Sequence, residues 1–143
     1  MLEIISASPD ETHSVGKKIA SCLLKGSVVA LQGDLGSGKT ALTKGIALGL
    51  GITDKITSPT YTIINEYSCE NSPTLYHIDA YRLSGDKDFE DIGGADILNS
   101  GGISIIEWSG LVPKSIPQDS INISIEITGE TSRLIKINGI EKL

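Results

Sequence analysis

The residues with the clearest chemical potential in this chain are Gly-Asp-Leu-Gly-Ser-Gly-Lys-Thr, at positions 33–40. They match the pattern G-x-x-x-x-G-K-[ST] of a phosphate-binding loop, or P-loop. Glycines in such a loop let backbone N–H groups turn inward around phosphate oxygens, because no Cβ blocks the approach. We expect Lys39 to reach the β- and γ-phosphates of a nucleotide and the hydroxyl of Thr40 to bind Mg²⁺.

The segments on both sides of this run favour the same interpretation. Residues 27–32 form a short apolar run typical of a buried strand, and residues 40–50 place Leu42, Ile46 and Leu50 on one helical face. The positive end of that helix would add to phosphate binding. A glycine-rich turn with a chance lysine is the alternative, and the strand–loop–helix order disfavours it.

Two acidic residues follow apolar strands at positions suited to metal or water. Asp79 closes the run 75–78 and Glu107 closes the run 103–106. Ligands of open α/β sheets collect at the carboxyl ends of the strands, and a P-loop ATPase needs a carboxylate near its metal and a group that orients water. The alternative for either acid alone is a solvated strand-end carboxylate.

Two further residues have open roles. The hydroxyl of Thr60 could meet Mg²⁺ or the γ-phosphate as a switch, or Thr60 could be a turn residue after Pro59. Trp108 directly follows Glu107. It could cover a cleft or pack in the core, and core packing is the default for its size.

These residues need a sheet to hold them, and the rest of the chain predicts one. We expect a single domain over residues 1–143 with an α/β fold: a three-layer, P-loop NTPase-like mixed sheet with flanking helices and antiparallel strands at the C-terminus. The expected strands are 2–6, 27–32, 61–67, 74–81, 102–108, 121–127 and 134–137, and the expected helices are one from Pro9 to Lys25-Gly26, one at 40–50 and one or two within 86–100.

The composition of the chain limits its expected location and its expected partners. The chain is 39% hydrophobic and 21% charged, which is ordinary for a soluble protein. It has no apolar run near the roughly 20 residues of a membrane span, and its N-terminus lacks the features of a signal peptide. We therefore expect a cytoplasmic protein without a membrane partner. The net charge of −6 and scattered lysines argue against strong independent nucleic-acid binding.

The cysteines and histidines suggest no metal centre. Cys22 and Cys69 are far apart and form no C-x-x-C pair, so we expect buried free thiols. His13 and His77 lack the spacing of metal ligands and are expected to be structural or surface residues. We expect neither a zinc nor an iron–sulfur site.

The order of four motifs resembles one known family. The P-loop at 33–40 is followed by Ser-Pro-Thr-Tyr-Thr-Ile-Ile-Asn-Glu-Tyr at 58–67, Tyr-His-Ile-Asp-Ala-Tyr-Arg-Leu at 76–83 and Ile-Glu-Trp at 106–108. From about Pro9 to Arg133 the chain is similar to TsaE, also called YjeE. That family is the bacterial ATPase of threonylcarbamoyladenosine (t⁶A) modification of tRNA, which works with TsaB and TsaD and does not itself modify the base.

The resemblance implies roles for individual residues, with ATP and Mg²⁺ as cofactors. Thr40 and Glu107 would bind Mg²⁺, Asp79 would be the Walker-B-like acid and Thr60 the switch threonine, alongside Lys39 in catalysis. Two segments, one with Glu11 and Thr12 and one with Gly129 and Arg133, would lie near the base and outer side of the nucleotide. The phosphates would be held by Leu35, Gly36, Ser37, Gly38, Lys39 and Thr40.

Three other functions are alternatives for a chain with this loop. A small-molecule kinase must clamp two anionic substrates, usually with arginine, and this chain has only Arg82 and Arg133. A regulatory GTPase would need a guanine-reading Asn-Lys-x-Asp motif, which the sequence lacks. A nucleotide-binding regulatory adaptor without turnover stays open, because an ATPase that needs a partner is also slow when isolated.

Overall fold

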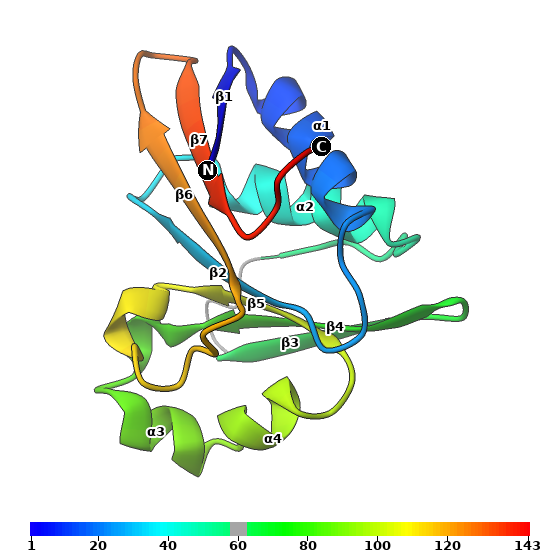
Figure 1. Ribbon diagram of the computed structural model, residues 1–143, viewed down its shortest axis with the longest axis vertical. Coiled ribbons are helices and arrows are strands. Elements are labelled where there is room, and N and C mark those ends of the chain that lie inside the picture. Colours follow the sequence, from blue (N-terminus) through cyan, green and yellow to red (C-terminus); the bar gives the residue numbers. More distant parts are fainter. Residues whose placement is uncertain (58–62) are drawn as a thin grey trace.

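A seven-stranded mixed sheet runs through the described part of the chain, with helices on both faces (Figure 1). The computed structural model describes residues 1–57 and 63–143. The strand order is β1-β7-β6-β2-β5-β4-β3. The elements are β1 (Leu2–Ser6), α1 (Pro9–Ala20), β2 (Val28–Gly33), α2 (Lys39–Gly49), β3 (Ile64–Cys69), β4 (Ser72–Asp79), η1 (Ala80–Arg82), α3 (Asp86–Asp91), α4 (Gly94–Leu98), β5 (Ile103–Glu107), η2 (Ser109–Leu111), β6 (Ile121–Ile127) and β7 (Arg133–Asn138).

The centre of the sheet is parallel and its two ends are antiparallel. Strand β2 pairs in parallel with β5 and β6, and β4 pairs in parallel with β5. The β3–β4 hairpin and the β6–β7–β1 strands are antiparallel. All five residues of β5 are buried, as expected for a parallel strand covered on both faces. The predicted three-layer α/β architecture, with antiparallel C-terminal strands, is confirmed.

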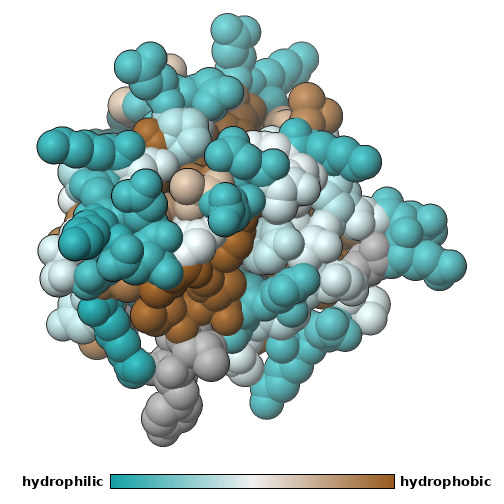
Figure 2. Space-filling view, turned by 90° about the horizontal axis from the view of Figure 1, so that it is seen from below, coloured by the Kyte–Doolittle hydropathy of each residue, from teal (hydrophilic) through white to brown (hydrophobic). Residues whose placement is uncertain are grey.

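Each face of the sheet has its own hydrophobic core. The larger core lies between the sheet and helices α1 and α2 and includes Leu42 and Ile105. The smaller core lies on the α3–α4 side and includes Phe89 and Ile106. Seen from that side, the surface is mostly hydrophilic, with one larger hydrophobic area and a few smaller ones (Figure 2). Since neighbouring residues of β5 belong to different cores, the side chains of a strand alternate between the two faces.

Helices α1 and α2 pack at unusually short range. A Cβ built on Gly45 of α2 would lie 2.0 Å from the carbonyl oxygen of His13, and one on Gly16 of α1 would lie 2.4 Å from that of Leu42. Only glycine permits this approach, because any side chain would overlap the facing backbone. The contact fixes α2, whose first turn follows the P-loop, against the middle of α1.

Some predicted boundaries are wrong by a few residues. Helix α1 ends at Ala20, not at Lys25-Gly26, because its last turn tightens: the N–H of Cys22 donates to Ile19 at 2.9 Å, a bond over three residues. Strand β4 ends at Asp79, not at residue 81, because Oδ1 of Asp79 accepts from the N–H of Tyr81 at 3.0 Å and starts η1.

The cysteine prediction is corrected for one residue. Cys22 is a free thiol, but it is half-buried at the edge of the larger core rather than fully buried. It lies in the turn after α1, between the exposed Ser21 and the buried Leu23. The side chain of Cys69 lies outside the described part of the structure.

The polar segment 86–100 forms the two short helices α3 and α4, as predicted. The hydroxyl and N–H of Ser84 donate to the carboxylate of Asp88. These donors hold the pKa of Asp88 below its usual range. None of the helices in the described ranges is long and apolar enough to cross a membrane.

Candidate nucleotide-binding site

The P-loop lies between the end of β2 and the start of α2. Gly36 and Gly38 have φ angles of 80° and 107°, in the left-handed region that glycine adopts at low cost. Helix α2 starts at Lys39 after the N-cap Gly38, and no described side chain caps it. Its first turn contains no acidic residue. A helix N-terminus built in this way is suited to an anion, because its N–H groups and dipole point toward the loop.

Lys39 is buried at the centre of the site. Its side chain is 8% exposed, and Nζ donates a hydrogen bond to the carbonyl oxygen of Gly33 at 2.7 Å. Nζ also lies 3.9 Å from Oε1 of Glu107 and 4.2 Å from the ring centroid of Trp108. The ammonium group is therefore held by a carbonyl, a carboxylate and an aromatic face, at the mouth of the P-loop.

The two predicted acids are neighbours at the carboxyl end of the sheet. Asp79 and Glu107 are paired in register on the parallel strands β4 and β5. Glu107 is buried and faces Lys39. Asp79 is half-buried, and its carboxylate accepts the N–H of Tyr81. The sheet thus brings Glu107 directly to Lys39, whereas Asp79 lies one strand farther out.

A histidine that sequence reasoning left out of the site lies beside Glu107. His77 is fully buried, and its Nε2 is hydrogen-bonded to Oε2 of Glu107. His77 precedes Asp79 by two residues, so both lie on the same face of β4. The His-x-Asp spacing on a strand was the available signal. We expected His77 to be a structural or surface residue, and that expectation did not include its contact with Glu107.

Trp108 turns the chain at the edge of the site. Among the described residues it is the only non-glycine residue with a positive φ, at 57°. Its ring is half-buried and packs against Tyr81, with centroids 5.1 Å apart. It also lines a cavity of about 410 Å³ with Gly33 and Asp34. The default expectation of core packing is therefore wrong in part: one side of the ring meets Lys39 and the cavity.

The interior of the loop contains a hydroxyl without a partner. Ser37 is 1% exposed, and its Oγ has no hydrogen-bond partner among the described residues. Its backbone N–H donates to the carbonyl of Asp34 at 3.0 Å, which closes a tight turn. An orphaned hydroxyl in a buried loop is costly unless a ligand or water satisfies it. This fits a loop built to receive phosphate oxygens.

A small cavity borders the outer side of the loop. It has a volume of about 140 Å³, and its walls come from the start of α1, the loop and the β6–β7 turn. Thr12, Gly36, Gly38 and Arg133 are among its lining residues. Thr12 is buried, and its hydroxyl is hydrogen-bonded to that of Ser6 at 2.7 Å. The structure therefore brings together two segments that the sequence separates by more than a hundred residues.

Other predicted site residues are placed differently. Glu11 is exposed, and its carboxylate accepts from the N–H of Ala7 near the start of α1, so its observed contact is a helix-capping one. Leu35 is 90% exposed at the tip of the loop. The carbonyl of Gly129 accepts from Arg133. Thr60 lies outside the described residues, and its role stays a prediction.

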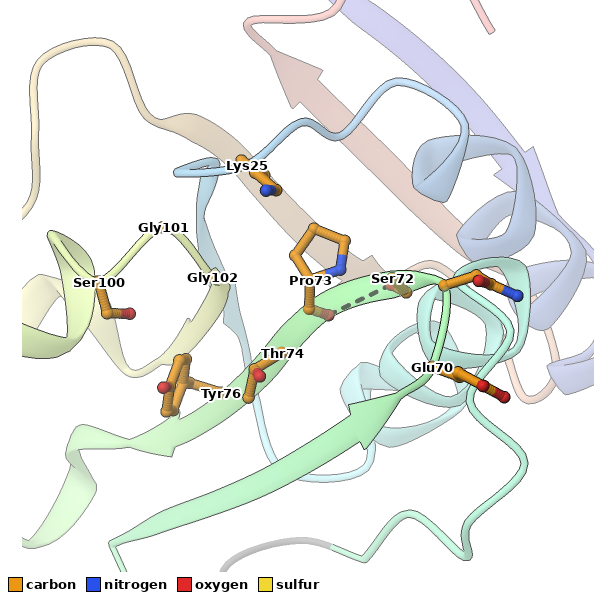
Figure 3. Close-up of a pocket in the computed structure, with 10 residues that line it drawn as sticks. Lys25, Glu70, Ser72, Pro73, Thr74, Tyr76, Ser100, Gly101 and Gly102 are labelled. Atoms are coloured by element: carbon orange, nitrogen blue, oxygen red, sulfur yellow. Dashed lines mark hydrogen bonds between the residues drawn. The ribbon is translucent and has the colours of Figure 1, made fainter.

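A larger cavity lies elsewhere, at the tip of the β3–β4 hairpin. Its volume is about 470 Å³, and Lys25, Thr74, Tyr76 and Ser100 line it (Figure 3). Thr74 and Tyr76 lie early in β4, whereas Asp79 ends that strand. No described residue of the P-loop or acid pair lines this cavity. Its size therefore does not make it the chemical centre, and the charged groups at the P-loop remain the candidate site.

The oxygen atoms near the P-loop fit a Mg²⁺ ion that is bound partly by the protein and partly by a nucleotide. Those of the described residues do not form a site in which protein ligands alone surround the ion. No group of three or more His, Cys, Asp or Glu side chains gathers in the described part of the chain in a way that could hold a metal. Mg²⁺ in NTPase sites takes one or two protein oxygens plus phosphates and water. Thr40 in the first turn of α2 and Glu107 at the end of β5 could provide them.

The mixed sheet, the glycine-rich loop after β2 and the lysine at the first turn of α2 define a P-loop NTPase-like α/β protein. Comparison of the sequence with known families is more specific. Residues 6–135 match the family described as threonylcarbamoyl adenosine biosynthesis protein TsaE. The chain belongs to the TsaE family.

Individual relatives agree with this assignment. The chain is 40% identical over 136 residues to the tRNA threonylcarbamoyladenosine biosynthesis protein TsaE of Treponema pallidum, covering 95% of this chain and 99% of the relative. It is 39% identical over 135 residues to the protein of the same name from Bacillus subtilis, covering 94% and 84%. The crystal structure of Bacillus subtilis YdiB matches with a TM-score of 0.80 and 36% identity, covering 94% of this chain and 82% of that one.

Proposed function

We propose that this protein is a Mg²⁺-dependent ATPase required to form t⁶A at position 37 of tRNAs that read codons beginning with adenine. It would act with TsaD and TsaB proteins rather than modify the base itself. One observation carries the proposal: Lys39, at the mouth of a glycine-rich loop, lies 3.9 Å from Glu107 at the end of a central parallel strand. The names of the relatives, which are t⁶A biosynthesis proteins, support the pathway.

Each residue has a task that follows from its position. The loop N–H groups and the start of α2 would bind phosphate oxygens. Lys39 would turn from the Gly33 carbonyl to the β- and γ-phosphates. Thr40 and Glu107 would hold Mg²⁺, which supplies charge neutralisation on the transferred phosphoryl group when bound. Asp79, beside Glu107 in the sheet, would orient the metal's water or the attacking water.

The small cavity beside the loop could receive the part of the nucleotide beyond the phosphates. Thr12 and Arg133 line it together with Gly36 and Gly38 of the loop. We propose that the base or ribose lies toward these two segments. A nucleotide-binding regulatory adaptor would bind ATP in the same way and would differ only in that it does not hydrolyse ATP. A small-molecule kinase is disfavoured, because Arg133 is committed to backbone carbonyls of the loop and turn.

The net charge and the family membership support a dependence on partner proteins. With a net charge of −6, the isolated protein should bind tRNA weakly, so contact with tRNA would run through TsaD and TsaB. We expect slow ATP hydrolysis by the protein alone and faster hydrolysis in their presence, because a partner can order the groups that position water.

The test is reconstitution of t⁶A formation on tRNA under multiple-turnover conditions, with and without this protein, while ATP hydrolysis is followed in parallel. We expect both modification and hydrolysis to rise when the protein is added to TsaD and TsaB. ATP binding without any stimulated hydrolysis would support the adaptor alternative. No change in modification or hydrolysis would refute the proposed role.

A further inference from the structure

The carboxylate of Glu107 is hydrogen-bonded to His77, a residue to which the proposed function assigns no role. Nε2 of His77 is hydrogen-bonded to Oε2 of Glu107, and Oε1 of the same carboxylate faces Nζ of Lys39 at 3.9 Å. The two oxygens therefore have different environments. One is directed into the protein, and the other is directed toward the P-loop.

Both partners of this hydrogen bond are buried, and its direction follows from the chemistry of the carboxylate. His77 is 0% exposed and Glu107 is 6% exposed. An ionised carboxylate can only accept, so Nε2 carries the hydrogen and donates it. The other ring nitrogen, Nδ1, is buried without a hydrogen-bond partner among the described residues. The interaction with Glu107 is thus the polar contact that the structure gives this imidazole.

The sheet makes the arrangement rigid. His77 pairs in register with Ile105, two residues before Glu107 on the neighbouring parallel strand. Leu75 and Ile105, on the same face, are fully buried in the larger core. The imidazole ring is therefore packed on a central strand, and its direction toward Glu107 follows from the strand backbone rather than from a mobile loop.

We propose that His77 is a positioning residue that fixes the rotation of the Glu107 carboxylate, so that Oε1 stays directed to the Mg²⁺–nucleotide site. The inference rests on the proposed function, because it assigns Glu107 to Mg²⁺. Partners behind a metal-binding group commonly change metal affinity or activity by about 10- to 100-fold when they are removed. His77 itself would contact neither metal nor nucleotide.

Three substitutions separate this role from simple core filling. His77→Gln places an amide N–H near the position of Nε2 and can still donate to Glu107. His77→Asn is also polar, but its amide reaches only as far as Nδ1. His77→Leu fills space without a donor. A purely structural histidine would tolerate Gln no better than Asn or Leu.

The main measurement is ATP affinity by calorimetry across a Mg²⁺ titration, with affinity in EDTA as the reference. In His77→Leu and His77→Asn, the half-saturating Mg²⁺ concentration should rise by about 10-fold or more, with affinity in EDTA unchanged. His77→Gln should remain close to the wild type. If His77→Leu does not fold, the difference in half-saturating Mg²⁺ concentration between His77→Gln and His77→Asn tests the proposal.

The outcomes separate the two proposals. If the wild type binds ATP with Mg²⁺ dependence but Gln and Asn behave alike, the positioning role is wrong and the proposed function stands. If the wild type shows no Mg²⁺-dependent ATP binding, the proposed function fails and the inference fails with it. Nitrogen NMR of the metal-free protein gives an independent readout: Nε2 of His77 should carry a hydrogen, and an Nε2 without a hydrogen would overturn the inference.

Discussion

Nε of Arg133 donates a hydrogen bond to the backbone carbonyl of Ser37 at 3.0 Å, across 96 residues of sequence. The same guanidinium donates to the carbonyl of Gly36 at 3.2 Å and to that of Gly129 at 3.0 Å. A loop that turns its N–H groups inward must turn carbonyls outward, and those carbonyls need donors. Arg133 provides them from β7, so the shape of the P-loop depends on the C-terminal hairpin.

Replacing Arg133 should therefore weaken nucleotide binding. We expect Arg133→Ala to lower ATP affinity about tenfold, since hydrogen bonds to a charged group are each worth about 1.5–3 kcal/mol. Arg133→Lys should restore little, because an ammonium lacks the planar fork that reaches several carbonyls. Calorimetry with a non-hydrolysable ATP analogue measures both variants.

The matched control for Arg133 is Lys136→Ala on the same strand. Lys136 forms an exposed ion pair with Glu126 at 3.4 Å, which should contribute little. This change also removes one positive charge. Equal losses in the Arg133 and Lys136 variants would mean that general charge matters and the contacts to the loop do not.

Lys39→Ala should abolish productive ATP binding or turnover. The change removes a buried cation that contacts Gly33, Glu107 and Trp108, and with it the charge expected to meet the phosphates. Titration calorimetry and a steady-state phosphate-release assay check this. Lys44→Ala, at an exposed position of the same helix, serves as the control. Retention of both affinity and turnover by Lys39→Ala would refute the P-loop assignment.

Glu107→Ala and Asp79→Asn should each reduce hydrolysis more than binding, since both acids are expected to act mainly on the reacting state. Asp79→Asn keeps an oxygen that can accept from Tyr81, so it tests charge with the start of η1 preserved. Turnover in saturating Mg²⁺ and partner proteins is the measurement.

The exposed Asp96→Asn in α4 is the control for the two acids. Full stimulated turnover in both the Glu107 and Asp79 variants would contradict the proposed metal and water roles. A loss confined to Glu107 would leave the metal assignment intact and remove Asp79 from the chemistry.

Much of the candidate site could be predicted because its residues lie in short sequence patterns, each within a single segment of the chain. The P-loop pattern fixed the positions of Gly33 and Lys39, and the acids at the ends of apolar strands met in register because parallel strands end at one edge. The predicted C-terminal hairpin also formed, because Ile121, Ile123 and Ile125 alternate with polar residues.

The rest depends on contacts that no local pattern encodes. Nothing in the spacing of Arg133 links it to Ser37, and the partner of His77 lies 30 residues away on the next strand. The position of Trp108 follows from a positive φ, which is rare for a bulky side chain and which no sequence pattern indicates here. The resemblance placed Glu11 near the nucleotide. Its observed contact is a local helix cap, and its contact with a nucleotide stays a prediction.

The close contact of α1 with α2 gives a prediction about stability. Gly45→Ala should destabilise the protein by about 1–3 kcal/mol or more, the usual cost of overpacking, because the new methyl group would meet the His13 carbonyl at 2.0 Å. Alanine favours helices by about 1 kcal/mol over glycine, so a net loss would isolate the packing effect. Urea unfolding followed by circular dichroism measures the free energy of unfolding.

Gly110→Ala is the control for this change, since its methyl group would meet only the side-chain amide of Gln32 at 3.2 Å. It should alter the free energy of unfolding little. Gly45→Ala should also weaken ATP binding, because a displaced α2 carries Lys39 and the loop with it. A Gly45→Ala protein as stable as the wild type, with unchanged ATP affinity, would show that α1 and α2 do not hold the P-loop in place.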